Sequence, residues 1–540
     1  MIVSDPTLKR LKGENIMKTK KNILKSMALP SIMLLLAVIA PMLSYGARAT
    51  WVFVNITMKL EVFTYIILAL MIANAIAMGV LTAIRANKLE KIYAKKSYSV
   101  ALAVSSILTV IFIIAGMSFC FGMLFSESGE VYKLYFQKSL EAAALIGLPA
   151  CLVLFYPALG CKAKKVVLAL VIIFVTAFGL SKLFPLSTYE ITSEPTVLNT
   201  GKDYSVVFST NDFGTGYVEY EYKGKTYKVY DQEGGRLSSD SKIHSVNVPY
   251  EHLDNNSYKV GSVRVIEQYS YGSRTGAEVV SDSYTFTPVT GDDITYLVIS
   301  DWHTYLDRAH EAISYIGDYD AVIFLGDATP GVDFEEQVVT NIVEFAGSVT
   351  NGTIPALYVR GNHETRGEYA GKILDALGLD EFYYTADMGE YSFVVLDSGE
   401  DKDDSHPEYG GMTDYNTYRA DMIDWLKGVK VNNDKVIALS HSWHISDVEP
   451  ELSKAGWDEI ARLGAKLMIS GHHHQCRLVG ADGGEEAEFL SAYPGITAYL
   501  DGGNMSGTYV ASKMTLSADT IYLEAYRNNG EKLFEHTIEW

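Results

Sequence analysis

The pattern of apolar and polar residues divides the chain into three parts, and long apolar stretches define the first. Five such stretches lie near residues 27–46, 60–84, 99–125, 139–160 and 165–183. Each is about long enough to cross a hydrocarbon core roughly 30 Å thick. We therefore expect a five-helix transmembrane region over residues 27–184, after a basic N-terminal segment, residues 1–26. Because four more stretches follow the first, we interpret it as an anchor and not as a cleaved signal peptide.

The second part, between Pro185 and Pro288, shows the short runs of a β structure. Gly, Asn and Asp turns separate the predicted strands, which are Tyr204–Phe208, Tyr217–Tyr220, Thr226–Tyr230, Ser245–Val248 and Val263–Ile266. Several short strands at a spacing of about ten residues are typical of an all-β sandwich. We expect a fibronectin III-like sandwich over residues 185–290.

In the third part, from Ile294 onward, short apolar runs alternate with helical segments. The expected strands are Ile294–Ser300, Ala321–Leu325, Ala356–Arg360, Val436–Ser440 and Lys466–Ser470. The expected helices are Ala309–Ile316, Glu335–Phe345, Tyr369–Leu377, Tyr418–Lys427 and Trp457–Leu463. Such alternation is typical of a layered α/β domain, which completes a multi-domain prediction with residues 291–540.

The distribution of charge predicts how the first part is oriented. Residues 1–187 hold 20 Lys plus Arg against 7 Asp plus Glu, and the remainder holds 25 against 58. The basic residues concentrate before the first apolar stretch, between the second and third, and between the fourth and fifth. The positive-inside rule therefore predicts a cytoplasmic N-terminus and, after five crossings, an extracytoplasmic position at the plasma membrane for everything past Leu183.

The charged residues within the apolar stretches indicate anchoring more than transport. The only acidic residues there are Glu61 and Glu141, both near the ends of stretches. We expect the helices to hold the chain in the lipid bilayer, while a lipid-binding or sensing role stays open. The acidic remainder argues against nucleic acid as a main partner. It contains a single cysteine, Cys476, so core packing and not an internal disulfide must hold it together.

Each expected strand of the third part ends at residues that can bind a metal ion. The apolar runs lead into Asp301-Trp302-His303, Gly326-Asp327, Gly361-Asn362-His363-Glu364, His441 and Gly471-His472-His473-His474. Open α/β sheets place their chemistry at these carboxyl ends of strands. The Asp-x-His and His-x-His spacings put two ligands on the same side of an extended segment, because side chains alternate with a period of two.

This set of side chains predicts two metal ions. The candidate ligands are Asp301, His303, Asp327, Asn362, His441, His472 and His474. Carboxylate, imidazole and amide oxygen suit divalent or trivalent Mn, Fe or Zn, and hence also a mixed-valence pair. Seven ligands are too many for one tetrahedral ion but suffice for two ions that share a carboxylate. Such a pair, about 3.5–4 Å apart, is suited to in-line displacement at phosphorus.

The ordered set of segments resembles the calcineurin-like metallophosphoesterase superfamily over roughly residues 294–540. The resemblance implies a β-sandwich flanked by helices, in which Asp327 bridges the two ions. It implies one ion bound by Asp301, His303, Asp327 and His474, and a second bound by Asp327, Asn362, His441 and His472. It further implies that His363 is the general acid that protonates the leaving alkoxide. A β-sandwich that precedes the catalytic domain is similar to the order in purple acid phosphatases.

Two departures from the family's patterns narrow the expected activity. Purple acid phosphatases usually have a tyrosine three residues after Gly326-Asp327, whereas this chain has Pro330, so we do not expect a purple enzyme. Many protein phosphatases of the superfamily carry Asp-Arg-Gly there, and the missing arginine argues against protein phosphatase activity. The candidates for binding substrate are Asn362, Arg360, Arg366 and His444, and the catalytic candidates are His363 and Asp327.

We expect hydrolysis of a phosphomonoester or phosphodiester by metal-bound hydroxide, with His363 as the proton donor. The acidic loop Ser398–Asn416 either shapes the pocket or is simply solvated. An alternative from another class is a metal-containing binding or sensing ectodomain without hydrolase activity. The presence of His363 disfavours it, because a pure binding site needs no acid there. The choice between monoesters and diesters, like the oligomeric state, stays open.

Overall fold

The computed structural model describes residues 188–540, except 270–271 and 506–507, together with the isolated residues Val166 and Ala169. Residues 187–540 form one compact unit. The predicted transmembrane helices lie outside the described residues, apart from those two isolated positions. In the described part of the chain, no helix combines the length and the apolar character that a bilayer crossing requires.

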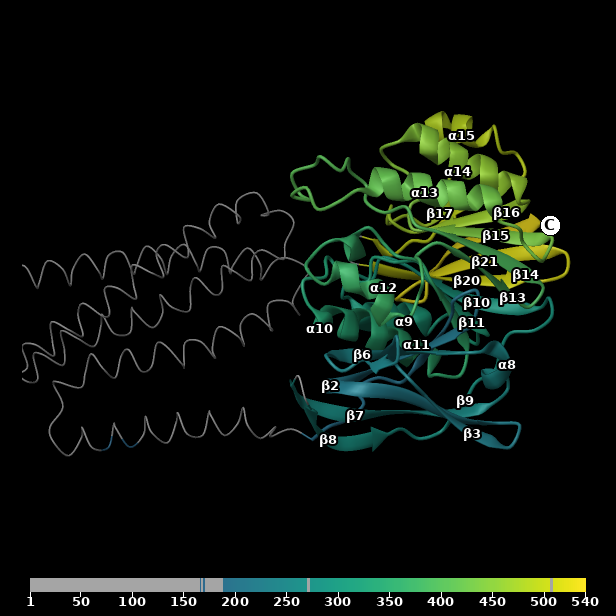
Figure 1. The fold of residues 1–540 in the computed structure, drawn as a ribbon. Coiled ribbons are helices and arrows are strands. Elements are labelled where there is room, and N and C mark those ends of the chain that lie inside the picture. The colour runs from purple at the N-terminus through teal and green to yellow at the C-terminus, as the bar shows by residue number, and fades with distance from the viewer. Residues whose placement is uncertain (1–165, 167–168, 170–187, 270–271, 506–507) are drawn as a thin grey trace, which may run out of the picture. The chain divides into compact units, whose positions relative to one another are not determined.

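Two β-sheets packed face to face form the centre of the third part (Figure 1). The larger sheet contains, in spatial order, β22 (Lys532–Glu539), β21 (Thr520–Arg527), β20 (Thr508–Leu516), β10 (Ile294–Ile299), β11 (Ala321–Phe324) and β12 (Pro355–Tyr358). The smaller contains β13 (Tyr384–Met388), β14 (Tyr391–Leu396), β15 (Lys435–Ser440), β16 (Ala465–Ser470), β18 (Thr497–Leu500) and β17 (Arg477–Leu478). Fully buried side chains such as Val298, Ile323, Val395 and Ile469 fill the space between the sheets.

Helices cover the outer face of each sheet. The larger sheet packs against α9 (Leu306–Ile313), α10 (Glu335–Val338), η6 (Val339–Glu344), α11 (Phe345–Thr350), η8 (Ala370–Lys372) and α12 (Ile373–Ala376). The smaller packs against α13 (Tyr415–Gly428), α14 (Pro450–Arg462) and α15 (Gly484–Leu490). The predicted α/β class with extensive β-sheet is confirmed, and the layers follow the order helix, sheet, sheet, helix.

The direction of the strands decides where loops from both sheets can meet. β10, β11 and β12 run parallel to one another, as do β14, β15, β16 and β18. Parallel strands present all their carboxyl ends at one edge of a sheet, where ligands bind in folds of this kind. Every strand that the sequence analysis connected with a metal ligand belongs to one of these two parallel groups.

The β region before Pro288 is built around one long strand, β2 (Tyr204–Tyr222). Two of the predicted strands are the two ends of β2, so their separation was wrong. The pairing register of β2 shifts between Ser209 and Gly214, and its halves therefore pair with different neighbours. These are β1 (Thr196–Asn199) and β6 (Ser241–Val248) at one end, and β3 (Lys225–Tyr230) and β7 (Ser257–Tyr269) at the other.

This region has its own core but is not isolated from the α/β part. Val206, Phe208, Val246 and Val260 are buried in a separate apolar cluster. β1 also pairs in parallel with β12, so main-chain hydrogen bonds join the two regions into one continuous sheet. The remaining elements are β4 (Gln232–Glu233), β5 (Arg236–Leu237), α8 (Tyr250–Leu253), β8 (Gly272–Val280) and β9 (Tyr284–Thr285). A fibronectin III-like domain with a boundary near residue 290 stays a prediction.

Most predicted helices are found, with shifted ends. The helix expected over Glu335–Phe345 continues to Thr350, and its middle segment, η6, is a π-helix. The segment Tyr369–Leu377 yields only η8 and α12, and Gly371 lowers the helix propensity there. α14 begins seven residues before its predicted start, at Pro450, because proline is favoured in the first turn of a helix. The strands β13, β14, β18 and β20 to β22 and helix α15 are additional to the sequence prediction.

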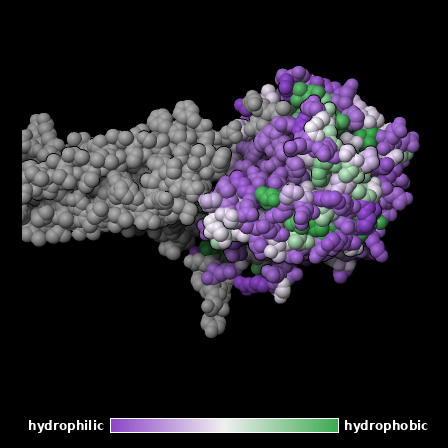
Figure 2. All heavy atoms as spheres, turned by 90° about the horizontal axis from the view of Figure 1, so that it is seen from above, coloured by the Kyte–Doolittle hydropathy of each residue, from purple (hydrophilic) through white to green (hydrophobic). Residues whose placement is uncertain are grey.

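The described surface is largely hydrophilic, as its acidic composition leads one to expect. Figure 2 shows one face on which polar residues predominate and apolar residues form small separate areas. The large apolar side chains exposed between residues 188 and 540 are Phe213, Val280, Tyr315 and Met412, which come from different elements. None of these four positions adjoins another in sequence.

His244, on β6, is a fully buried histidine of the β region. Its Nε2 lies 3.1 Å from Thr210 Oγ1 and 3.2 Å from Ser262 Oγ, and Asp231 Oδ2 is 4.0 Å from its Nδ1. Burial lowers the pKa of His244 to about 3, because the charged imidazolium would lose its hydration. The folded β region therefore favours neutral His244.

We predict that His244 makes the β region sensitive to acid. A folded pKa below the unfolded value of about 6.5 gives stability that is present above pH 6.5 and is lost as the pH falls towards 3, by up to about 1.4 kcal/mol per pH unit. His244→Gln should remove this dependence. Hydrogen exchange of β2 and β6 amides in the full chain, measured as a function of pH below neutrality, checks this. Equal pH slopes in the two proteins would contradict it.

Candidate metal centre and active site

The metal-type residues predicted at five strand ends come together at one edge of the two sheets. Asp301 and His303 follow β10, Asp327 follows β11, and Asn362 and His363 follow β12. His441 follows β15, and His472 and His474 follow β16. Three groups of these side chains have ligand atoms within 4.8 Å of one another. The larger and the smaller sheet therefore each supply part of a single constellation.

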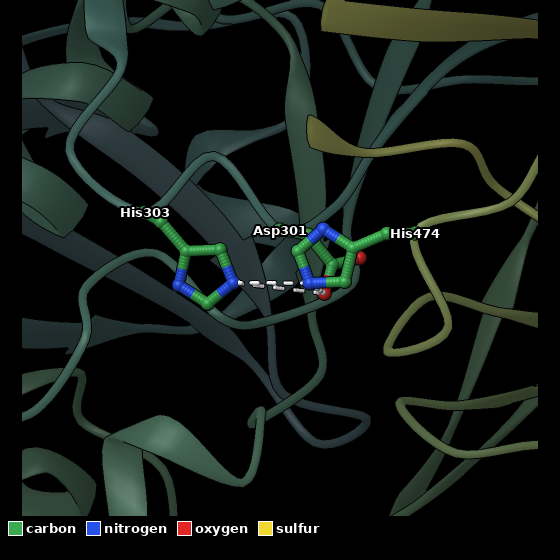
Figure 3. Close-up of side chains that lie close together, drawn as sticks. All are labelled: Asp301, His303 and His474. Carbon is green, nitrogen blue, oxygen red and sulfur yellow. Dashed lines mark hydrogen bonds and ion pairs between the residues drawn. The ribbon is translucent and has the colours of Figure 1, made fainter. Parts of the chain in front are cut away.

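The first group consists of Asp301, His303 and His474 (Figure 3). The two imidazoles approach from opposite sides, and their Nε2 atoms are 3.4 Å apart. Asp301 Oδ1 lies 3.5 Å from His474 Nε2 and 4.0 Å from His303 Nε2. Asp301 is fully buried, whereas His474 is partly exposed. Three side chains that can donate lone pairs thus converge, and His474 is the most exposed of them.

The second group is centred on Asp327. Its Oδ2 lies 3.2 Å from His441 Nε2, and His472 belongs to the same group of ligand atoms. His441 Nδ1 donates to the carbonyl oxygen of Leu325 at 2.6 Å, which leaves Nε2 free to bind a metal ion. Asp327 Oδ2 is also 3.7 Å from His303 Nε2. This carboxylate therefore lies between the first and the second group, where a bridging ligand must lie.

The amide of Asn362 provides the test of whether a cation fits. Its inner end lies 3.2 Å from Asp327 Oδ2, 3.2 Å from His441 Nε2 and 3.1 Å from His472 Nδ1. The inner end can be either the oxygen or the nitrogen of the amide, because swapping the two changes only which of them faces these three atoms. With a cation among these acceptors the oxygen would face inwards and bind it; without one, the amide nitrogen would donate inwards and the oxygen would accept from Arg366 Nη2 at 2.9 Å. The donor set thus fits a metal ion.

The electrostatics of the group agree with this. Burial lowers the pKa of His441, but Asp327 and Asp301 outweigh burial and raise it to about 10. Burial also acts to raise the pKa of Asp327, yet His441 and His363 hold it well below its usual range. Without a cation, the buried carboxylates of Asp327 and Asp301 therefore keep His441 protonated at the nitrogen that faces the centre. A metal ion would take the place of that proton.

Glu364 holds two of the ligand loops together. Its Oε2 accepts hydrogen bonds from the backbone N–H groups of Asp327 and Gly361, each at 2.9 Å, and its Oε1 accepts from Ala328 at 2.5 Å. Glu364 is fully buried; burial and the nearby Asp327 raise its pKa to about 7. In the sequence Glu364 is recognisable only as part of its motif, and this role was not predicted.

A further strand-end carboxylate, Asp501, was also missed. It follows β18 and accepts hydrogen bonds from Ser300 Oγ at 2.7 Å and Ser512 Oγ at 2.5 Å. Gly503, two residues later, has φ +47°, and a Cβ there would lie 2.6 Å from Asp301 Cβ. The signal was present in the sequence, since Asp501-Gly502-Gly503 follows an apolar run as Gly326-Asp327 does.

The backbone around the ligands is strained. Asp301, His303, Asp327, His472 and His474 all have positive φ, between 37° and 65°. Such conformations cost of order 1–3 kcal/mol each for residues other than glycine and persist where the surroundings enforce them. Between two of these residues lies Trp302, which is fully buried and donates from Nε1 to the carbonyl oxygen of Asn341 in the π-helix η6 at 2.8 Å.

His363 lies at the edge of the constellation, with one ring nitrogen turned towards it. Its Nδ1 donates to the carbonyl oxygen of Pro330 at 2.9 Å, so Nε2 is the nitrogen turned towards Asp327 Oδ2, 3.9 Å away. It lies in η7 (His363–Thr365) and remains partly exposed. His363 also forms a ligand-type group with His303 and Asp327, so a role as a ligand must be tested against the role as an acid.

Of the two arginine candidates, Arg366 reaches the site. Its Nη1 lies 3.5 Å from each ring nitrogen of His363, and its Nη2 lies 2.9 Å from the amide of Asn362. Arg360 instead donates to Asp397 Oδ2 at 2.5 Å and covers the ring of Phe382. The structure therefore gives Arg360 a role in packing, and its binding of substrate has no contact to support it.

His444 lies on the flank of the centre formed by the loops after β15 and β16. Its ring centroid is 6.0 Å from that of His473 and 3.8 Å from that of Trp443. Burial lowers its pKa. Cys476 packs against the core between the sheets, and burial raises its pKa to about 12, which argues against a thiolate ligand.

The comparison with protein families agrees with this geometry. The model of the calcineurin-like phosphoesterase family matches residues 294–476, the segment that contains every candidate ligand. These residues, about a third of the chain, are similar to that family. The match makes the protein a phosphoester hydrolase, as the resemblance implied. No curated protein sequence is significantly similar to the chain.

Several solved structures resemble the calcineurin-like phosphoesterase domain more distantly. A purple acid phosphatase from yellow lupin (Lupinus luteus) seeds is 15% identical, covers 64% of this chain and 74% of its own, and has a TM-score of 0.43. GAP50, described as the anchor in the inner membrane complex of Plasmodium, is 14% identical over 46% of this chain and 89% of its own, with a TM-score of 0.33. A metallophosphoesterase from Sphaerobacter thermophilus is 14% identical with the same coverage and a TM-score of 0.22. These values are too low to transfer a substrate.

We predict that Glu364→Gln weakens metal binding at the centre but leaves the chain folded. Glutamine keeps the size but has one acceptor oxygen, so at least one of the three backbone N–H groups loses its partner, at a cost of about 1–3 kcal/mol. Affinity for Mn²⁺ should fall about tenfold or more, because support behind metal ligands is typically worth that much. Calorimetric titration of the full chain measures this. Glu368→Gln, an exposed neighbour, is the matched control; equal affinities in both variants would contradict the prediction.

Proposed function

We propose that the protein is a membrane-anchored, metal-dependent phosphoesterase that hydrolyses phosphomonoesters or phosphodiesters at a dinuclear centre. The observation that carries the proposal is the position of Asp327, whose Oδ2 lies within 3.7 Å of His303 and 3.2 Å of His441. One carboxylate between two groups of nitrogen and oxygen donors is the arrangement that two neighbouring ions require.

In this proposal the ligands would divide between the two ions as the resemblance implies. Asp301, His303 and His474 would hold one ion; Asn362, His441 and His472 would hold the other, and Asp327 would bridge them. Mn, Fe and Zn suit these donors. When bound, the ions supply a hydroxide nucleophile near neutral pH and neutralise phosphate oxygens. Pro330 occupies the place where a purple enzyme would have its tyrosine, and its carbonyl oxygen accepts a hydrogen bond from His363 instead.

The remaining residues act on the substrate directly. Because the Nδ1 proton of His363 is held by Pro330, Nε2 is the atom that can pass a proton to the leaving alkoxide. Arg366 is placed beside His363 and Asn362, where its guanidinium can contact a phosphate oxygen. His444 is a candidate contact for the leaving group on the opposite flank.

The placement of the enzyme rests on its sequence. Five apolar stretches and the positive-inside distribution support an extracytoplasmic catalytic domain held at the plasma membrane by its lipid-embedded helices. The acidic charge of the remainder disfavours nucleic acid as a main substrate. A reporter fused after residue 540 and assayed on intact cells tests this placement: protection from an external protease would contradict it.

We predict that Asp327→Ala and His363→Ala fail in different ways. Loss of the bridging carboxylate should remove bound metal and turnover together. Loss of His363 should keep about two metal equivalents per chain and lower turnover about 10²–10⁴-fold. The loss should be larger for an alkyl ester than for a 4-nitrophenyl ester, whose leaving group needs no proton.

Elemental analysis of the purified full chain and hydrolysis of aryl and alkyl phosphates with added Mn²⁺ provide the measurements. His310→Ala is the matched control, because His310 is exposed and contacts Ser348 away from the ligands. Loss of metal in His363→Ala would make His363 a ligand. Unchanged turnover in both site variants would rule out the proposed chemistry and favour a binding or sensing ectodomain.

A further inference from the structure

The loop Ser398–Asn416 forms one side of the proposed active site. It carries six carboxylates and one lysine. Arg419 of α13 anchors its start by donating to the carbonyl oxygens of Ser398 at 3.0 Å and Glu400 at 3.2 Å. Asp404 anchors its end, because its carboxylate accepts from the backbone N–H groups of Tyr415 and Asn416. The charges of this loop therefore have a definite place relative to the metal ligands.

The loop neutralises the arginine that faces the substrate. Glu400 is fully buried and holds Arg366 with two parallel hydrogen bonds, both 2.7 Å. Asp401 Oδ1 lies 3.2 Å from Arg366 Nη2, and Glu408 Oε1 lies 3.6 Å from Arg366 Nη1. Lys402 contacts the same Asp401 and Glu408. Two cations thus face three carboxylates, and the group keeps a net charge of −1.

The surplus negative charge lies close to the reacting centre. Arg366 Nη1 lies 3.5 Å from His363 Nε2, so Arg366 alone separates Glu400 and Asp401 from His363. Asp401 is partly exposed; burial acts to raise its pKa, but Lys402, Arg366 and, least of all, His472 hold it below its usual value. Arg360, which could have restored a positive balance, is paired with Asp397. His406, 3.7 Å from Glu408, adds charge only if protonated.

We propose that the group formed by Glu400, Asp401 and Glu408 with Arg366 and Lys402, here called the acidic rim, makes the site a phosphodiesterase. The site would be selective for monoanionic phosphodiesters over dianionic phosphomonoesters. The inference rests on the proposed function and adds the class of substrate. A diester brings one negative charge to the rim, whereas a monoester brings about two. Only the side chain of Arg366 separates the negative charge of the rim from the position proposed for the phosphate. The rim therefore repels the doubly charged monoester more strongly than the diester.

The same charge acts on the product. Hydrolysis adds one water across a P–O ester bond of the diester and releases an alcohol, which takes the proton from His363, and a phosphomonoester. The product carries one more negative charge than the substrate at neutral pH. The rim that admits the diester therefore favours departure of the monoester, and the reaction stops after one ester bond.

The test compares substrate charges within each variant of the full chain. The wild-type chain with Mn²⁺ should have a higher kcat/KM for bis(4-nitrophenyl) phosphate than for 4-nitrophenyl phosphate, and should release no inorganic phosphate from the former. Asp401→Asn and Glu408→Gln should each lower this ratio roughly threefold, as expected for one charge removed a few ångströms from the phosphate. Added salt should reduce the wild-type ratio in the same direction.

Asp424→Asn is the matched control, because Asp424 is exposed on α13 and pairs with Lys427 at 2.7 Å. Equilibrium binding of phenylphosphonate and of its monomethyl ester, measured by calorimetry, gives a second reading that needs no turnover. Phenylphosphonate, which is the dianionic analogue of a phosphomonoester, should gain affinity in Asp401→Asn and Glu408→Gln. A wild-type preference for monoesters, or ratios and affinities that shift no more than in Asp424→Asn, would overturn the inference. Absence of any hydrolysis with normal binding selectivity would instead overturn the proposed function alone.

Discussion

The fully buried carboxylate of Asp327 is the constraint on which the rest of the site depends. A buried negative charge is costly unless positive groups or a cation surround it, and here His303, His363 and His441 all point ring nitrogens towards it. Those histidines come from three different loops. Each loop must therefore be held to within a fraction of an ångström, and this requirement explains the concentration of positive φ values and of buried hydrogen bonds around the centre.

The layered fold satisfies that requirement because it supplies rigid starting points. Parallel strands end at one edge of each sheet, and the apolar core between the sheets fixes the distance between the two edges. The loops that leave the strands are then tied to one another: Glu364 joins the loops after β11 and β12, and Asp501 joins the loop after β18 to Ser300 at the end of β10. The candidate ligands of this domain therefore lie at strand ends, and the buried carboxylates of Glu364 and Asp501 hold the loops there together by hydrogen bonds.

Electrostatic balance distinguishes the inner from the outer part of the site. The inner part collects histidines and carboxylates that would be stable together only around cations. In the outer part, Arg366, the arginine beside His363, forms ion pairs with Glu400, Asp401 and Glu408. A structure with the same ligands but a free arginine would present a different field to a phosphate group, and on this ground we assign the proposed discrimination between substrates to the loop after β14 and not to the ligand set.

The sequence alone determined the α/β class of the third part and the residues at five strand ends, because each is a local pattern: an apolar run that stops at a polar or glycine residue. Asp501 followed the same rule and was overlooked, since a single acid before two glycines is a weak signal. Only the tertiary structure decided that Arg366 and not Arg360 faces the centre, that Glu364 binds two loops, and that β1 joins β12 into one sheet. These facts depend on contacts between residues far apart in the chain, and such contacts exist only once the two sheets have packed.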